Sequence, residues 1–290
     1  HSVCNIVFKH SVCVLVVLYH LLFFSTIAPL SQIETCGLRS FVMLKLIVSI
    51  LTTIWLSSSV VSAGAHSQYL DYTIGNKQFK AFAVFPKTES KGNVYIIHDW
   101  NGLTDYEQKR AGMLADLGFT AIALDLFGVE AKLEGFEDYR RETGALYKNR
   151  DEFRTRIKTA INAASNALGV GSRNILIGYC FGGAAVLEAA RAAMDLDGFV
   201  SFHGGLNTPE GQDYAQTKGS VLLLHGSADP VSGMVDLANL MNQLQEAGVE
   251  HDAEIYGGAR HSFTVDGSRD YDASADQKSW QALTQFLEEI

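Results

Sequence analysis

Proline and cysteine are scarce in this chain of 290 residues, which holds only four of each. With so few prolines there is no proline-rich linker to divide the chain into domains. The sequence also lacks internal repeats and low-complexity tracts. Hydrophobic residues make up 47% and charged residues 19% of the chain. That composition is typical of a globular enzyme and excludes a disordered chain.

The chain has no basic run, and its formal net charge is −9. Residues 66–290 hold 20 Lys and Arg against 31 Asp and Glu, a net charge of −11. A body this acidic repels nucleic acid and anionic membranes, so we exclude nucleic acid as a partner. The glycine-rich fingerprints of nucleotide-binding loops are missing, so we expect no nucleotide cofactor.

Metal-ligand motifs such as HExxH are missing as well. A metal site could still be assembled from His98, His203, His225 and Asp229, although no ligand spacing supports it. We therefore expect neither a cofactor nor a metal.

A secretion signal is predicted over residues 43–65. Met43 and Lys45 form a short positive start, residues 46–56 are apolar, and residues 63–65 read Ala-Gly-Ala, a typical cleavage site. The apolar run falls short of the roughly 20 residues that a membrane span needs. We expect a periplasmic or secreted protein with no stable membrane span after cleavage. An uncleaved membrane anchor is the alternative.

Residues 1–42 are interpreted as an over-extended reading frame upstream of a start at Met43, with an extra membrane segment as the alternative. Residues 66–290 are then expected to form a single domain. Three of the cysteines precede Met43, so this domain keeps only Cys180 and forms no internal disulfide. A lone cysteine is either buried filler or a functional thiol.

The hydrophobic pattern of residues 66–290 predicts an α/β fold. Residues 68–74 and 78–86 alternate apolar and polar side chains, as in an antiparallel hairpin. Short apolar runs then predict buried strands at 94–97, 120–124, 174–177, 199–202, 221–224 and 253–256. Periodic segments predict helices at 104–117, 149–168, 181–194, 232–247 and 273–289. This alternation predicts a mostly parallel central sheet with helices on both faces and a site at the carboxyl ends of its strands.

Gly178-Tyr179-Cys180-Phe181-Gly182 follows one of these strands and has the pattern of a nucleophile elbow with Cys in place of Ser. Its glycines permit a turn so sharp that the central side chain stands clear of the sheet. Cys180 would lie at a helix N-terminus, which favours a thiolate. A glycine-rich packing turn around a buried cysteine is the alternative.

Asp229 and His261 follow the last two predicted strands. The chain order nucleophile, acid, histidine is the order that this type of elbow requires, so we expect Cys180, Asp229 and His261 to form a catalytic triad. Alternatively, Asp229 forms a turn before Pro230 and His261 is a surface histidine.

Together these segments resemble the dienelactone hydrolase family, a Cys-nucleophile branch of the α/β-hydrolases. The resemblance covers about residues 68–290. The matching segments are 178–183 (GYCFGG), 124–128 (LDLFG), 225–230 (HGSADP) and 261–263 (HSF).

The resemblance implies a role for each matching residue. Cys180 would be the nucleophile, His261 the base and Asp229 its orienting partner. Asp99 matches the position of an acidic residue, usually Glu in the family, that activates the nucleophile. The backbone N–H groups of Trp100 and Phe181 would hold the oxyanion.

Members that hydrolyse dienelactone bind the substrate carboxylate with arginines. One of those positions is Val265 here, and Arg140 or Arg141 and Arg260 are the candidates that remain. We therefore predict hydrolysis of a small ester or lactone through a thioester, with Arg141 and Arg260 as candidate substrate-binding residues. The alternatives are a cysteine-dependent redox or glyoxalase-like protein and a non-catalytic binding protein on the same fold.

Overall fold

The computed structural model describes residues 66–169 and 171–290. The predicted reading-frame extension over 1–42 and the predicted signal peptide over 43–65 lie outside the described residues. Within these residues, no helix combines the length and the apolar composition that crossing a bilayer would require.

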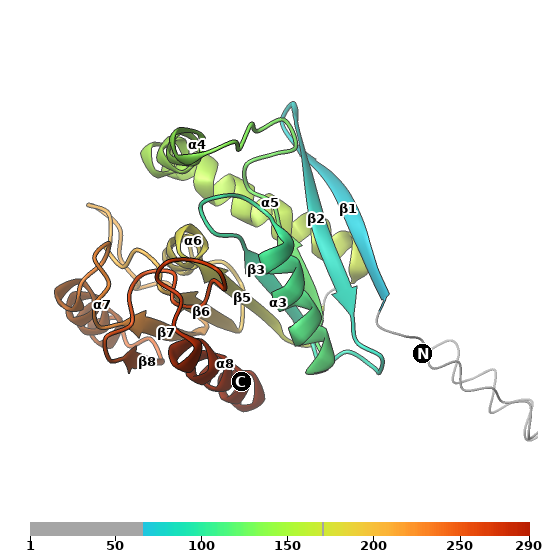
Figure 1. The fold of residues 1–290 in the computed structure, drawn as a ribbon. Coiled ribbons are helices and arrows are strands. Elements are labelled where there is room, and N and C mark those ends of the chain that lie inside the picture. The colour runs from blue at the N-terminus through green and yellow to red at the C-terminus, as the bar shows by residue number, and fades with distance from the viewer. Residues whose placement is uncertain (1–65, 170) are drawn as a thin grey trace, which may run out of the picture. The chain divides into compact units, whose positions relative to one another are not determined.

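The described chain alternates strands and helices (Figure 1). The strands are β1 (His66–Ile74), β2 (Lys77–Phe85), β3 (Asn93–Ile97), β4 (Thr120–Leu124), β5 (Asn174–Tyr179), β6 (Gly198–Phe202), β7 (Ser220–Gly226) and β8 (His251–Tyr256). The helices are α3 (Asp105–Asp116), α4 (Phe136–Lys148), α5 (Arg150–Leu168), α6 (Phe181–Arg191), α7 (Met234–Glu246) and α8 (Ala273–Glu289). Every predicted strand and helix is present, with ends shifted by a few residues at most.

The strands form one sheet in the order β1-β2-β4-β3-β5-β6-β7-β8. β1 pairs antiparallel with β2, and β2 pairs antiparallel with β4. All other neighbours, from β4 through β3 to β8, are parallel. The predicted hairpin and mostly parallel sheet are confirmed.

Helices cover both faces of this sheet (Figure 1). One hydrophobic cluster packs side chains of α5, α6 and α7 against the sheet, and a second cluster packs α3 and α8 against the other face. Alternate residues of a single strand serve the two clusters, because successive side chains point to opposite faces. In β3, Tyr95 and Ile97 belong to the first cluster, whereas Val94 and Ile96 belong to the second.

Helix α4 was not predicted. It buries only Thr143 and Leu146 and carries charged residues along most of its length. Its polar and charged composition, rather than a lack of helical periodicity, kept this segment from standing out as a packed helix. It precedes α5, whose first turn is capped by the side chain of Asn149.

Candidate active site

The turn between β5 and α6 has the geometry of a nucleophile elbow. Cys180 has φ 55° and ψ −110°, a backbone conformation that side chains rarely adopt. A Cβ atom on Gly178 would lie 2.2 Å from the carbonyl oxygen of Gly182, and one on Gly182 would lie 2.2 Å from that of Ile97. Glycine is therefore required on both sides of Cys180.

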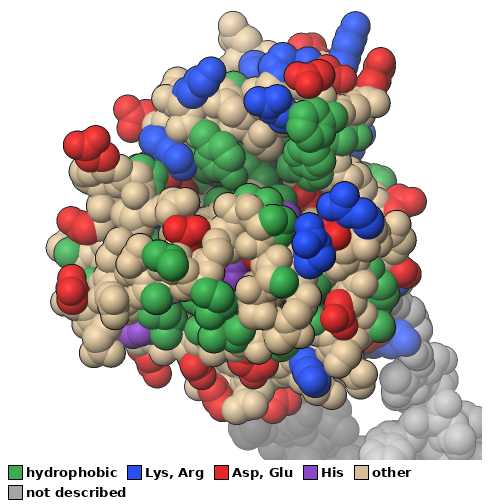
Figure 2. All heavy atoms as spheres, turned by 60° about the vertical axis from the view of Figure 1, so that its left-hand side comes forward, with side chains coloured by type: hydrophobic (Ala, Val, Ile, Leu, Met, Phe, Trp, Pro, Cys, Tyr) green, Lys and Arg blue, Asp and Glu red, His purple; other side chains and the backbone are tan. Residues whose placement is uncertain are grey.

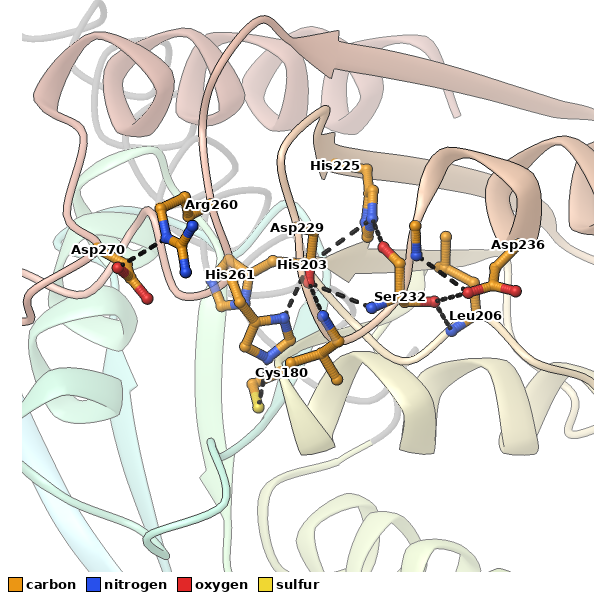
Figure 3. A network of polar contacts seen from close by, with 12 residues as sticks. Cys180, His203, Leu206, His225, Asp229, Ser232, Asp236, Arg260, His261 and Asp270 are labelled. Atoms are coloured by element: carbon orange, nitrogen blue, oxygen red, sulfur yellow. Dashed lines mark hydrogen bonds and ion pairs between the residues drawn. The ribbon is translucent and has the colours of Figure 1, made fainter.

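The side chains of Cys180, His261 and Asp229 form a chain of contacts in that order (Figure 3). Nε2 of His261 lies 3.0 Å from Sγ of Cys180, and Nδ1 of His261 lies 2.8 Å from Oδ2 of Asp229. The three side chains follow the carboxyl ends of β5, β7 and β8. These strands are parallel, so their carboxyl ends lie at the same end of the sheet. The structure thus brings together the three residues of the predicted triad.

Asp229 is fixed from two sides. Its Oδ1 accepts hydrogen bonds from the backbone N–H groups of Val231 (2.7 Å) and Ser232 (3.2 Å), while Oδ2 faces His261. Burial favours a higher pKa for this carboxyl, but the bond with His261 and the two N–H groups outweigh burial and lower the pKa. An ionised carboxylate only accepts hydrogen bonds, so Nδ1 of His261 carries the proton and Nε2 is left to accept one from the thiol.

Asp99 lies against the same sulfur. Burial raises the pKa of its carboxyl to about 6, while hydrogen bonds with the N–H of Trp100 and with Cys180 act in the opposite direction. Burial also raises the pKa of the Cys180 thiol, and the charge of Asp99 and its hydrogen bond raise it further. Both shifts indicate that the resting site holds a thiol beside the Asp99 carboxyl.

The two backbone N–H groups expected at the oxyanion also face Cys180. The N–H groups of Phe181 and Trp100 interact with the sulfur and lower its pKa, against the larger effect of burial. The N–H of Trp100 also donates to Oδ1 of Asp99. A reacting carbonyl oxygen placed next to Sγ would therefore lie near both donors.

Glu107 is a buried residue that the sequence analysis missed. Its Oε1 accepts the backbone N–H of Asp99 (3.1 Å), and its Oε2 accepts the N–H and the hydroxyl of Thr104 (both 2.8 Å). This carboxylate thus ties the loop that carries Asp99 and Trp100 to the start of α3. The Thr-x-x-Glu spacing of a capping box, visible in the sequence, was the available signal.

Tyr147, on α4, was also missed. Burial raises the pKa of its phenol, and electrostatic interaction with the acidic groups of Cys180 and Asp99 raises it further. Its ring lies 5.7 Å from that of Phe181. No sequence motif marks it, because only packing brings α4 to the site.

His203 stands edge-on to the triad histidine, with ring centroids 5.5 Å apart. Its Nε2 pairs with the hydroxyl of Thr264 at 2.7 Å. Burial holds its pKa well below the usual range, and the neighbouring imidazole of His261 lowers it further. His203 is therefore a neutral neighbour of His261.

His98 and His225 form structural hydrogen bonds. Nδ1 of His98 donates to the carbonyl of Asp99 (2.6 Å), and its Nε2 accepts the N–H of Leu126 (3.1 Å). Nε2 of His225 pairs with the carbonyl of Ser232 at 2.8 Å. In the part of the chain that the structure describes, no three His, Cys, Asp or Glu side chains are arranged to share a metal ion.

Carboxylates engage both candidate substrate-binding arginines. Arg141 is paired with Asp138 and Glu142 on α4. Nε of Arg260 lies 3.1 Å from Oδ1 of Asp270, toward which its side chain points (Figure 3). Neither guanidinium is paired with a triad residue.

Comparison with known proteins gives a family and a fold. The model of the dienelactone hydrolase family matches residues 79–290. A dienelactone hydrolase-like promiscuous phosphotriesterase from metagenomic libraries is 32% identical, covers 78% of this chain and 99% of its own, and superposes with a TM-score of 0.72. The solved structure of m3DLH is 29% identical, covers 78% of this chain and 98% of its own, and has a TM-score of 0.73. The α/β-hydrolase fold is thereby confirmed.

An uncharacterized protein of Caenorhabditis elegans is also similar. It is 29% identical over 148 residues, which are 48% of this chain and 94% of that protein.

Proposed function

The chain belongs to the dienelactone hydrolase family and is a hydrolase, and on that premise we propose that it cleaves small esters or lactones through a thioester on Cys180. The observation that carries the proposal is the alignment of Sγ, the His261 imidazole and the Asp229 carboxylate at 3.0 and 2.8 Å. The redox and binding-protein alternatives give no reason for this alignment.

The reaction begins when Nε2 of His261 takes the thiol proton and the sulfur attacks the substrate carbonyl. The tetrahedral oxyanion is held by the N–H groups of Phe181 and Trp100. His261 then gives its proton to the departing alkoxide, which leaves the acyl group on Cys180. A water molecule, deprotonated by His261, attacks the thioester and releases the acid and the thiol.

Asp99 has two effects on this sequence. Its negative charge raises the pKa of the thiol, which protects the resting enzyme from unproductive alkylation or oxidation. It also occupies the N–H of Trp100. A substrate oxygen entering the site competes with Asp99 for that N–H, so binding weakens the contact between the carboxyl and the loop.

Export is a second part of the proposal. The positive start at Met43, the apolar run and the Ala-Gly-Ala segment before residue 66 support a periplasmic or secreted location. The N-terminal residue of the protein recovered from an expressing cell tests this. Cleavage after Ala65 supports export, and an uncleaved chain in the cytoplasm contradicts it.

A panel of esters and lactones, assayed with the purified protein and its Cys180→Ala variant, tests the catalytic proposal. The panel includes a phosphotriester, because a relative 32% identical is a promiscuous phosphotriesterase. We expect the variant to lose turnover on the order of a million-fold, as other nucleophile knockouts do. Mass spectrometry of quenched wild-type enzyme should find the acyl group on Cys180. Unchanged esterase activity in Cys180→Ala would sink the proposal.

A further inference from the structure

Four aromatic side chains link the site to α4: Trp100, from the loop after β3, packs on Phe136 and Tyr139 of α4, and Tyr147 of the same helix packs on Phe181 next to Cys180. We call them the aromatic wall. The indole of Trp100 makes edge contacts with the ring of Phe136 at 5.3 Å and with the ring of Tyr139 at 5.2 Å between centroids. The backbone N–H of Trp100 interacts with Sγ of Cys180, so this end of the aromatic wall lies next to the nucleophile.

The wall presents apolar surface to solvent. Phe136 is 57% exposed and Tyr147 36% exposed, although both are large and apolar. Trp100 and Tyr139 are partly exposed. Exposed aromatic surface gathered next to a reactive group typically marks a ligand-binding surface.

A second apolar surface follows Asp229. Val231 and Val235 are 64% and 73% exposed, and the N–H of Val231 donates to the Asp229 carboxylate. Exposed apolar side chains therefore follow Asp229, in the loop before α7 and in its first turn, as well as standing on α4. Figure 2 shows a histidine at the bottom of a hollow, with hydrophobic side chains gathered above it on the side of α4.

Two of the three arginines considered for the substrate are already paired with carboxylates. Arg260 pairs with Asp270, and Arg141 pairs with Asp138 and Glu142. Arg140 stacks on the wall, 5.5 Å from the centroid of the Phe136 ring. It makes no ion pair within the described residues, so it is the group that a carboxylate substrate would have to use.

We propose that the site accepts neutral esters or lactones carrying an aromatic ring, which packs on the aromatic wall, in preference to lactones that bear a carboxylate. This inference rests on the proposed hydrolysis by Cys180 and names its substrate class. The rings of the wall offer edges and faces to a flat substrate group. A substrate carboxylate would lose water and find Arg141 and Arg260 already paired, and an ion pair with Arg140 would draw that guanidinium off the Phe136 ring.

Two matched ester pairs test the proposal, one that varies the acyl group while methanol stays the leaving group and one that varies the alcohol while the acyl group stays acetyl. The first pair is methyl 3-phenylpropanoate and methyl 3-cyclohexylpropanoate, and the second is benzyl acetate and cyclohexylmethyl acetate. We expect kcat/KM to favour the aromatic member about three- to tenfold in at least one pair, the range of an aromatic contact. The 4-carboxyphenyl analogue of the first ester should be hydrolysed about tenfold less well than its parent, since its charge stays unpaired.

Variants connect the preference to the wall. Phe136→Ala and Phe136→Leu should each abolish the aromatic preference while Tm stays near that of the wild type, because Phe136 is more than half exposed. Tyr69→Ala is the matched control, since Tyr69 is a 53% exposed aromatic on β1 and takes no part in the site. Arg140→Ala should leave the rate on the carboxylated ester unchanged.

The two proposals fail in different ways. If the wild type hydrolyses none of these esters, the proposed hydrolysis fails. If it hydrolyses them in a Cys180-dependent way but treats phenyl and cyclohexyl members alike in both pairs, the aromatic wall does not select substrates. A faster reaction with the carboxylated ester, lost in Arg140→Ala, would also overturn the inference.

Discussion

The carboxyl group of Asp99 accepts a hydrogen bond from the backbone N–H of Trp100, the same N–H that faces the Cys180 sulfur. One carboxyl thus influences both the nucleophile and a donor expected to hold the oxyanion. The family's usual residue at this position is the longer Glu, but here the shorter side chain still reaches the sulfur.

Replacing Asp99 by Asn should lower the pKa of the Cys180 thiol. Asn keeps the size and an acceptor oxygen but removes the negative charge that raises the thiol pKa. A neighbouring like charge typically shifts a pKa by about 1–3 units. The rate of alkylation by iodoacetamide, followed across pH, measures the change. In the wild type, ionisation of Asp99 near its pKa of about 6 should suppress the thiolate, and this feature should vanish in the variant.

The control for that experiment is Asp105→Asn, which removes an exposed carboxylate in the first turn of α3. It should leave the alkylation profile unchanged. A thiol pKa in Asp99→Asn equal to or above that of the wild type would contradict the role given to Asp99.

Asp229→Asn should reduce kcat by about ten-thousandfold, as the same change does in other triads. The Asn oxygen can still accept the N–H groups of Val231 and Ser232 at the Oδ1 position. The amide nitrogen would then face Nδ1 of His261 and force the ring proton onto Nε2, where it blocks proton transfer from the thiol. Steady-state kinetics on the best ester measures the loss. Asp252→Asn, at an exposed position of β8, is the control, and a loss below tenfold in Asp229→Asn would count against the triad.

Glu188 lies in α6, and removing its buried carboxylate should strongly lower the free energy of unfolding. It is fully buried and contacts Arg150 (3.0 Å), Arg154 (2.7 Å) and Arg191 (2.9 Å). Removing one partner of a buried ionic cluster typically costs about 3–5 kcal/mol. Urea unfolding of Glu188→Gln should show that loss at neutral pH. Asp195→Asn, which breaks an exposed pair with Lys218, should cost about 0–1 kcal/mol.

The pH dependence of this loss has a definite sign. Burial opposes ionisation of Glu188, but the arginines outweigh it and hold the pKa below its ordinary 4.5. A depressed carboxyl pKa contributes stability that is complete above the unfolded value and disappears as pH falls through the folded value. The difference between wild type and Glu188→Gln should therefore shrink in acid. A difference that is constant from neutral pH to strong acid would contradict the ionic account.

Gly182→Ala should destabilise the protein by about 3 kcal/mol or more, because the new Cβ would meet backbone and cannot be relieved by a side-chain rotation. That atom would lie 2.2 Å from the carbonyl oxygen of Ile97. Gly144→Ala is a matched control inside α4, where the added Cβ meets nothing within 4 Å. It should stabilise the protein by about 0.5–1 kcal/mol. Thermal unfolding of the two variants measures both effects, and equal Tm values would refute the steric account of the elbow.

The sequence by itself determined the order of strands and helices, the elbow at Cys180, and the chain order of Asp229 and His261. Buried strands appear as continuous apolar runs, and the elbow appears as spaced glycines, because backbone geometry imposes those patterns locally. Helix α4 escaped detection because it buries only two side chains, Thr143 and Leu146.

Only the tertiary structure decided which side chains meet. The contact of Asp99 with the sulfur, the hold of Glu107 on the Asp99 N–H, and the pairing of Arg260 with Asp270 depend on side-chain positions between separate segments. The aromatic wall likewise exists only because α4 packs against the loop of Trp100. Such contacts form between loops and helices that only the packed fold brings together, and local periodicity carries no information about them.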